Sequence, residues 1–269
     1  MTSVAGTPQL TAGGKVRPLP AVRQTATMAW RSLVSVKHNP LELIDFSITP
    51  IMFVVLFTYV FGGQMAGSPQ AYLQYALAGI IVQNALFTTM YTAMALNTDL
   101  TKGVFDRLRS LPIARSAPLL GRIAADLCKQ LWAMLLMVGL GTLLGFRITT
   151  GLGGFVAAIA LLLLFTAAFS WTAVLVGMLA GDPEKVQVFA FTLLFPITFT
   201  SSAFVQVDTM PGWLQGWVKV NPVTQISDAF RGLLTGGPVA APVFWSLVWA
   251  AGIAAVFVPL SMRAYRARS

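Results

Sequence analysis

Residues 99–122, DLTKGVFDRLRSLPIARSAPLLGR, decide how this chain is organised. The stretch holds five of the 18 Lys and Arg residues, and Pro112 interrupts it. On each side lies a mostly apolar segment of about twenty residues, the length that an α-helix needs to cross a bilayer. A basic, helix-forming loop between two membrane spans offers a surface on which something outside the membrane can act on the part inside it.

The composition is that of an integral membrane protein. The 269 residues are 56% hydrophobic and 10% charged, whereas soluble proteins average about 25% charged residues. The formal charge of +9 does not indicate nucleic-acid binding, because the basic residues lie beside apolar segments, as in cytoplasmic loops of membrane proteins. With one cysteine, Cys128, and one histidine, His38, the chain lacks an intrachain disulfide and the multi-cysteine or multi-histidine metal sites.

Apolar segments predict an all-α fold with six transmembrane helices, at about residues 44–61, 72–96, 123–145, 155–179, 186–204 and 243–262. Residues 1–20 are expected to form a disordered cytoplasmic tail, and residues 21–268 one transmembrane domain. Residues 21–39 have the spacing of an amphipathic helix in the membrane interface, although an ordinary linker also fits them. The short segment 62–68 is expected to be a loop.

The segment between the fifth and sixth spans is too polar for a span and too apolar for a free loop. It is expected to form short re-entrant or interfacial helices. Pro222, after Asn221, suits the first position of the second of these helices. Within that helix, Asp228 and Arg231 are spaced to pair at i, i+3.

Lys and Arg residues fall unevenly on the two sides of this arrangement. Fourteen lie with the termini, the 99–122 loop and the 181–185 turn, and three lie on the opposite side. Lys129, within the third span, completes the 18, and it is expected either to pair with Asp126 or to extend to the membrane interface. The asymmetry predicts that both termini are cytoplasmic.

The sequence contains no chemistry of its own for energy conversion. It has no phosphate-binding G-x-x-x-x-G-K-[ST] loop, no pair of carboxylates deep in a span, and no arrangement of nucleophile and base. The chain is therefore predicted not to be an enzyme by itself. If it moves a solute uphill, a partner must supply the work.

Polar residues on the second span form a stripe at helical spacing. Asn84, Thr88 and Thr92 recur every fourth residue, with Gln83 beside them. Two interpretations stand side by side: a surface that lines a substrate path, and hydrogen bonding between helices. Pro50 in the first span and Pro196 in the fifth remove backbone donors and are expected to act as hinges.

Three segments together resemble the ABC-2 type permeases, and most of all the daunorubicin-resistance-type drug exporters. These are VFDRLRSLPIARSAPLLGR at 104–122, LFPITFTSSAFV at 194–205 and KVNPVTQISDAFRGLLTGG at 219–237. With the six spans, the likeness covers nearly the whole chain. Ser201 and Ser202, in the second segment, join the candidate path residues.

The resemblance implies a permease that forms a homodimer or a related heterodimer and binds two cytoplasmic ATPase subunits, which carry ATP and magnesium; this chain needs no cofactor. A coupling helix at about 102–111 would contact the ATPase. The implied contact residues are Lys102, Phe105, Arg107, Leu108, Arg109, Pro112 and Arg115 in the loop, Arg31 in the N-terminal helix and Glu184 in the 181–185 turn.

The function implied in this way is export of an amphipathic drug or lipid across the cell membrane. Two other functions stay open. One is export of a polysaccharide or glycolipid by a permease of the same superfamily, and the other is an uncoupled membrane channel or structural subunit. Apart from lipid, the ATPase and a second permease copy, no further partner and no nucleic acid are expected.

Overall fold

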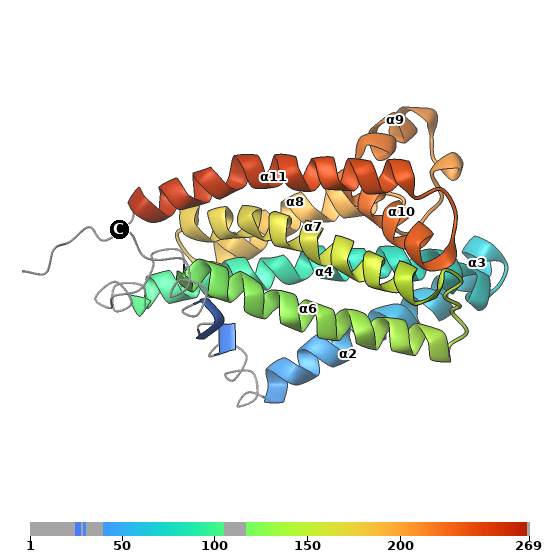
Figure 1. Cartoon of the computed structure of the whole chain (residues 1–269), viewed down its shortest axis with the longest axis horizontal. Coiled ribbons are helices and arrows are strands. Elements are labelled where there is room, and N and C mark those ends of the chain that lie inside the picture. Colours follow the sequence, from blue (N-terminus) through green and yellow to red (C-terminus); the bar gives the residue numbers. More distant parts are fainter. Residues whose placement is uncertain (1–24, 28, 31–39, 105–116, 268–269) are drawn as a thin grey trace, which may run out of the picture.

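The chain is a bundle of long helices (Figure 1). The computed structural model describes residues 25–27, 29–30, 40–104 and 117–267. Within these ranges there is no strand, which confirms the all-α expectation. The elements are α2 (Pro40–Leu56), the π-helix η1 (Phe57–Phe61), α3 (Gly62–Ala66), α4 (Pro69–Thr101), α6 (Ala117–Leu143), α7 (Gly151–Leu179), α8 (Pro183–Phe199), the 3₁₀-helix η2 (Val207–Thr209), α9 (Gly212–Val220), α10 (Pro222–Thr235) and α11 (Ala240–Ala267).

Three helices begin with the same local signal, a polar residue followed by proline. Ser68, Asp182 and Asn221 are the N-caps of α4, α8 and α10, and each side chain accepts a hydrogen bond from a backbone N–H of the first turn. The proline that follows has the φ angle of a helix and lacks the N–H that would be unpaired there. The sequence expectation for Asn221 and Pro222 is confirmed.

Five of the described helical segments are long and apolar enough to cross a membrane by length and composition: Ser47–Ala66, Pro69–Thr101, Pro118–Leu143, Gly151–Leu179 and Ala240–Tyr265. The fifth expected span corresponds to α8, which has 17 residues. At 1.5 Å per residue α8 is about 25 Å long, slightly less than the hydrocarbon core of a bilayer.

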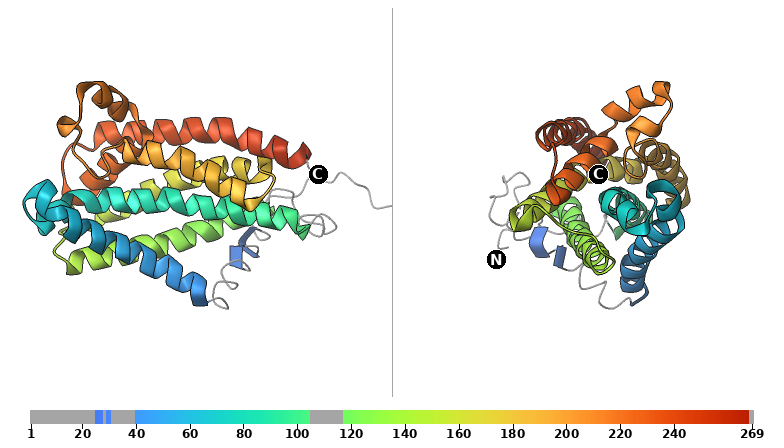
Figure 2. Two further views of the ribbon diagram at one scale, coloured as in Figure 1. Left: turned by 180° about the vertical axis from the view of Figure 1, so that it is seen from behind. Right: turned by 90° about the vertical axis from the view of Figure 1, so that its right-hand side faces the viewer.

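Helix α4 is the centre of the bundle, and α6, α7, α8 and α10 all contact it. Its side chains Leu73, Leu77, Ile81 and Leu86 are fully buried. Two backbones approach closely where glycine stands: a Cβ on Gly177 of α7 would lie 2.6 Å from the carbonyl oxygen of Ala93 in α4. By contrast, α2 crosses the bundle obliquely and exposes much of its apolar surface (Figures 1 and 2).

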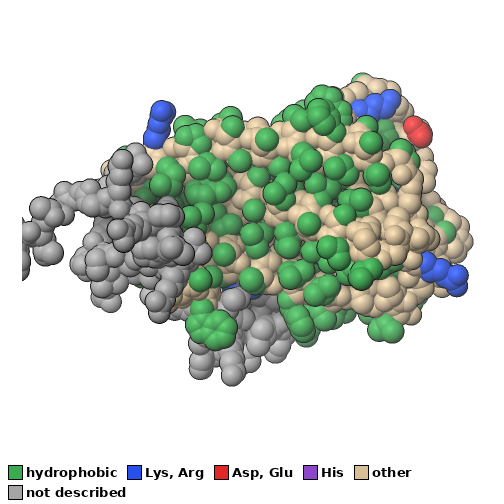
Figure 3. Space-filling view, viewed as in Figure 1, with side chains coloured by type: hydrophobic (Ala, Val, Ile, Leu, Met, Phe, Trp, Pro, Cys, Tyr) green, Lys and Arg blue, Asp and Glu red, His purple; other side chains and the backbone are tan. Residues whose placement is uncertain are grey.

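Charged side chains gather toward the ends of the bundle, and apolar side chains cover the face between them (Figure 3). One end carries α3, α9 and the end of α10, and is called the α9 end below (Figure 1). The other carries the C-terminus of α11 and the last turn of α4, and is called the C-terminal end.

Two expectations about helix bounds are corrected. The expected 62–68 loop is largely helical, because η1 and α3 continue α2 as far as Ala66. The helix ends at Gly67, whose φ is +72°. Helix α8 ends at Phe199 rather than at 204, and a turn follows over residues 200–205, called the α8 turn below. The turn carries apolar residues beyond the end of the helix because its side chains Ala203 and Phe204 pack into the bundle, where they are buried.

The two cytoplasmic helices expected at 21–39 and 102–111 lie mostly outside the described residues. Of the first, residues 25–27 and 29–30 are helical, and the Trp30 side chain is exposed. Of the second, Lys102 is the C-cap of α4 and Gly103, with φ of +68°, follows it in a turn.

Candidate functional site

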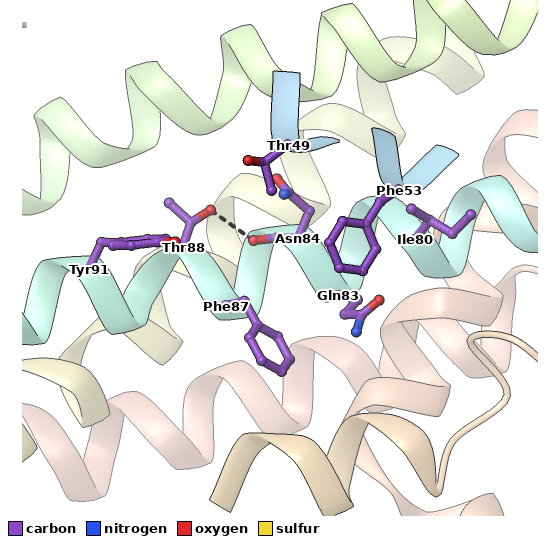
Figure 4. Close-up of a pocket in the computed structure, with 8 residues that line it drawn as sticks. All are labelled: Thr49, Phe53, Ile80, Gln83, Asn84, Phe87, Thr88 and Tyr91. Carbon is purple, nitrogen blue, oxygen red and sulfur yellow. Dashed lines mark hydrogen bonds between the residues drawn. The ribbon is translucent and has the colours of Figure 1, made fainter. Parts of the chain in front are cut away.

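A pocket of about 150 Å³ lies between α2 and α4. Thr49 and Phe53 of α2 form one side (Figure 4). The other lining residues come from one face of α4, and they are Ile80, Gln83, Asn84, Phe87, Thr88 and Tyr91. They share that face because residues three and four apart on a helix lie above one another.

The lining combines polar groups without charge and aromatic rings. The Gln83 side chain is 94% buried, since only 6% of it is exposed. Its Oε1 atom and the Oδ1 atom of Asn84 are buried and have no hydrogen-bond partner within the described part of the chain. Buried polar groups in proteins are almost always paired, so unpaired amides at a pocket wall are groups that a ligand or water would satisfy. Phe53 and Phe87 supply flat apolar surfaces beside them (Figure 4).

The structure therefore brings together three of the predicted path residues, Gln83, Asn84 and Thr88. The Thr88 hydroxyl donates to the backbone carbonyl of Asn84, 2.8 Å away, which satisfies it within its own helix. Volume sets a limit on the occupant, because a cavity of about 150 Å³ holds a group the size of one benzene ring.

Thr92, the fourth residue of the stripe, does not line this pocket. Its Oγ1 donates to Oδ2 of Asp126 on α6 at 2.7 Å. The same carboxylate lies 3.4 Å from Nε of Arg122 and 3.7 Å from Nζ of Lys129, which confirms the expected pairing of Asp126 with Lys129. Thr92 therefore links α4 to a charged cluster near the start of α6.

Ser201 and Ser202 lie in the α8 turn, away from the pocket lining. Both are buried. The Ser202 hydroxyl donates to Oδ1 of Asp228 at 2.8 Å, and its backbone N–H donates to Oγ1 of Thr224 at 3.1 Å. Ser202 therefore holds the turn against α10, whereas the Ser201 hydroxyl donates to the carbonyl of Thr198 in α8 and accepts from the backbone N–H of Ala203. The expected pair of Asp228 with Arg231 is confirmed, with 2.6 Å between Oδ1 and Nη1.

The two predicted hinge prolines precede irregular backbone. Pro50 lies inside α2, seven residues before η1 begins at Phe57. Pro196 lies inside α8, three residues before that helix ends. A π-helical turn is a rare break in α-helical hydrogen bonding that is often found at functional sites.

Most of the predicted ATPase contacts fall outside the described residues: Arg31, Phe105, Arg107, Leu108, Arg109, Pro112 and Arg115. Lys102 and Glu184 are described, and both are exposed at the C-terminal end. Next to Glu184, Asp182 accepts hydrogen bonds from Nζ and from the backbone N–H of Lys185, at 2.7 and 2.8 Å. These bonds hold the pKa of the Asp182 carboxyl below its usual value.

The two phenylalanine rings and the isoleucine that line the pocket were missed by the sequence interpretation. Phe53, Ile80 and Phe87 read as ordinary lipid-facing residues in a membrane helix. The signal that would have found Phe87 is its spacing, since it follows Gln83 by four residues on the same face. No comparable signal marks Phe53 and Thr49, because which face of α2 meets α4 depends on packing.

The residues that form the pocket and the α8 turn lie within a region that matches a known protein family. Residues 23–235 match the description "ABC-2 type transporter". The chain belongs to the ABC-2 type transporter family. The resemblance noted in three sequence segments is thereby confirmed. Proteins of this family are membrane transport subunits, so this permease is embedded in a membrane.

Three relatives of this ABC-2 permease show how far the likeness extends. Daunorubicin resistance ABC transporter permease protein DrrB1 of Streptomyces coeruleorubidus is 41% identical over 257 residues, which are 96% of this chain and 91% of that protein. Probable doxorubicin resistance ABC transporter permease protein DrrC of Mycobacterium tuberculosis is 30% identical, covering 91% of this chain and 90% of its own. Putative transport permease ycf38 of Cyanophora paradoxa is 24% identical, covering 78% and 73%.

Proposed function

We propose that this chain is the permease subunit of an ATP-driven exporter that moves an amphipathic drug or lipid out of the cytoplasm or the inner leaflet. The pocket between α2 and α4 is the observation that carries the proposal. Its lining offers unpaired amide groups beside aromatic rings and bears no charge. Such a lining suits a solute that is apolar over most of its surface and has a few hydrogen-bonding groups.

The size of the pocket supports a site that is larger than one copy of the chain. Drug-sized ligands occupy pockets of about 300–1,000 Å³, several times what α2 and α4 enclose here. Large apolar side chains are exposed on α2, η1 and α8, among them Met52, Tyr59, Val188 and Phe189. A second permease copy, identical or related, facing this surface would enlarge the site and cover it.

Energy would enter at the C-terminal end of the bundle. With six spans and both termini in the cytoplasm, the loop at 102–116 and the turn at Glu184 face the same side as the two ATPase subunits, which bind ATP and magnesium. The exposed Lys102 and Glu184 side chains are available for this contact. Closure of the ATPases would then be passed through the loop to α4 and α6, with Pro50 and Pro196 as hinges. The cell membrane is the proposed location.

The similarity to DrrB1 and DrrC supports a drug as the solute. Those relatives are named for daunorubicin and doxorubicin resistance. Both are matched over about nine tenths of their length, so the likeness includes every element around the pocket.

The test is transport by proteoliposomes that contain the permease and its ATPase. A panel of amphipathic compounds is screened for stimulation of ATP hydrolysis and for accumulation in the vesicles. Asn84→Leu should raise the concentration for half-maximal stimulation by roughly threefold to tenfold, the value of one hydrogen bond. Gln187→Leu, an exposed amide on α8 outside the pocket, is the matched control and should change nothing.

Two results would contradict the proposal. Solute flux that needs neither ATPase nor ATP would make the chain an uncoupled channel. Equal responses of Asn84→Leu and Gln187→Leu would remove the pocket from the transport path. Coupling is tested separately with Arg107→Glu and Arg109→Glu, which should abolish co-purification with the ATPase, whereas Lys219→Glu at the opposite end should not.

A further inference from the structure

A run of stacked phenylalanine rings leads from the pocket to the α8 turn. Phe87, on the pocket wall, meets Phe191 of α8 edge to face, with ring centroids 6.1 Å apart. Phe191, Phe195 and Phe199 follow one another along α8, with 5.3 and 4.2 Å between centroids. Phe199 then stacks on Phe204 in the α8 turn at 5.2 Å.

The run crosses from there to α2 and returns to the pocket. Phe204 stacks on Phe57, the first residue of η1, with 4.9 Å between centroids. Phe57 in turn lies 5.9 Å from Phe53, which lines the pocket on the α2 side. The pocket, together with the rings that border it from Phe87 along α8 and from Phe53 to Phe57, is called the groove below. The Phe57–Phe204 stack joins the two rows of rings at the α9 end.

Nothing polar connects Phe57 to Phe204. Ring stacking is a contact between apolar surfaces, so the two rings can separate without leaving a polar group unpaired. The backbone on each side is also irregular, since Phe57 begins the π-helix and Phe204 lies in a turn. This contact is therefore one of the easiest places at which the two sides of the groove can part.

The α8 turn, by contrast, is held by directional hydrogen bonds. The Tyr75 hydroxyl of α4 donates to the carbonyls of Ser202 and Val205, at 2.8 and 3.2 Å. The Tyr72 hydroxyl donates to the carbonyl of Phe204 at 3.3 Å. A buried turn inside an apolar bundle needs such partners, because its carbonyls have no ladder of their own.

Arg231 of α10 ties these parts together. Its Nη2 donates to the carbonyl of Ser202 at 3.0 Å, its Nε donates to the carbonyl of Tyr75 at 2.9 Å, and its Nη1 binds Asp228. The guanidinium carbon also lies 3.9 Å from the centre of the Tyr75 ring. One planar group thus joins α10, α4 and the turn, which a lysine could not do because its single ammonium lacks this fork.

We propose that the Phe57–Phe204 stack is a gate at the α9 end of the groove and that Arg231 is the positioning residue that holds the gate shut. The Arg231 contacts fix the α8 turn, and the turn places Phe204 against Phe57. Release of the turn would separate the two rings and open the groove toward the α9 end. This inference rests on the proposed function only for the identity of the solute that would pass through the opening.

The test measures access to the groove without requiring transport. Cys128 is replaced by serine, and Asn84→Cys then provides one thiol in the pocket. Lys219→Cys on α9 first shows whether the α9 end is reached from outside intact cells or from outside inverted vesicles. That preparation is then treated with a charged, membrane-impermeant methanethiosulfonate. The rate of Asn84→Cys modification is compared among gate variants of the full-length chain.

Arg231→Gln and Phe57→Ala should each raise the modification rate at least tenfold. Arg231→Lys should give an intermediate rate, because it keeps the charge pair with Asp228 but not the contacts with both carbonyls. Two matched controls should leave the rate unchanged: Arg147→Gln, an exposed arginine between α6 and α7, and Phe244→Ala, an exposed ring near the start of α11 and outside the stacked run. Elution as a single folded species is required of every variant, and a variant that fails is replaced by Phe204→Leu, which keeps apolar volume but not the stack.

Equal modification rates in Arg231→Gln, Phe57→Ala and the controls would overturn the gate. Loss of dimer in the Phe57 variant with unchanged labelling would instead make the stack an interface between copies. Failure of the proposed function looks different. If no compound is transported but the gate variants open the groove as expected, the gate stands and the solute proposal falls.

Discussion

Replacing Gly79 with alanine tests how closely the α8 turn is seated on α4. A Cβ at Gly79 would lie 1.9 Å from the carbonyl oxygen of Ala203 and 2.5 Å from its Cα. Contacts between non-bonded carbon atoms are optimal at about 3.5–4.0 Å, so the turn would have to move by more than about 1 Å. The obstruction is backbone, which cannot be relieved by a change of rotamer.

The expected free-energy change combines three effects. Alanine in a helix interior is favoured over glycine by about 0.5–1 kcal/mol. Overpacking opposes this with about 1–3 kcal/mol. Displacing the turn also weakens the bonds from Tyr75 and Arg231 to the Ser202 carbonyl, and a buried polar group left unpaired costs about 1–3 kcal/mol. The net loss in the free energy of unfolding is roughly 1–5 kcal/mol.

Thermal unfolding of the purified protein in one detergent measures this loss. Soluble domains of 150–250 residues lose about 2–4 °C per kcal/mol, so the midpoint for Gly79→Ala should fall by roughly 10 °C. Gly139→Ala in α6 and Gly252→Ala in α11 are matched controls, because nothing lies within 4 Å of a Cβ at either position. Their midpoints should stay level or rise. A Gly79→Ala midpoint equal to theirs would refute the close seating of the turn.

Three more outcomes are expected in the same unfolding assay. Asn221→Asp should destabilise the protein by roughly 2–3 kcal/mol, more than an ordinary exchange of N-cap residues. The Asn221 amide N–H₂ donates to two carbonyls at the end of α8, which a carboxylate would repel. An unchanged stability would contradict these two hydrogen bonds. Asp126→Leu should cost about 3–5 kcal/mol, since it removes the carboxylate beside Arg122 and Lys129 and leaves the Thr92 hydroxyl without its acceptor, and Asp126→Asn, which can still accept from Thr92, should cost less. Asp182→Ala should lower stability at pH 7 more than Asp182→Asn, which keeps the helix cap. Because the pKa of Asp182 is lowered in the folded protein, the charged carboxylate stabilises the fold above the ordinary pKa of 3.8, and this stabilisation fades as the pH falls below it. Stability curves of the unmodified protein and Asp182→Asn that stay parallel at acid pH would refute the ion pair.

The sequence predicted those features that depend on neighbouring residues. Three such features involve residues one to three positions apart. They are the start of α10 at Asn221 and Pro222, the pair of Asp228 with Arg231, and the pair of Asp126 with Lys129. Helical geometry alone brings such residues together. The all-helical fold followed in the same way from the lengths of the apolar segments.

Features that depend on distant residues were out of reach. Besides Asp228, Arg231 binds carbonyls 29 and 156 residues earlier in the chain, and no local pattern predicts either contact. The α8 turn was interpreted as part of a span because residues 200–205 carry no charge and end in Ala203, Phe204 and Val205, whereas in the structure Tyr75 and Arg231 bind carbonyls of the turn. Thr92 was grouped with the polar stripe for the same reason, since only the packing of α6 places Asp126 beside it.

The contact between Gly177 and Ala93 has a consequence for motion. At that point two backbones touch without intervening side chains, and Asn97 of α4 also donates to the carbonyls of Gly177 and Ala180 at 2.9 Å. Rotation of either helix about its own axis would drive peptide groups into one another. Helices α4 and α7 must then move together, as one lever, and relative displacement falls to helices that are less enclosed, such as α2, whose span is only 22% buried.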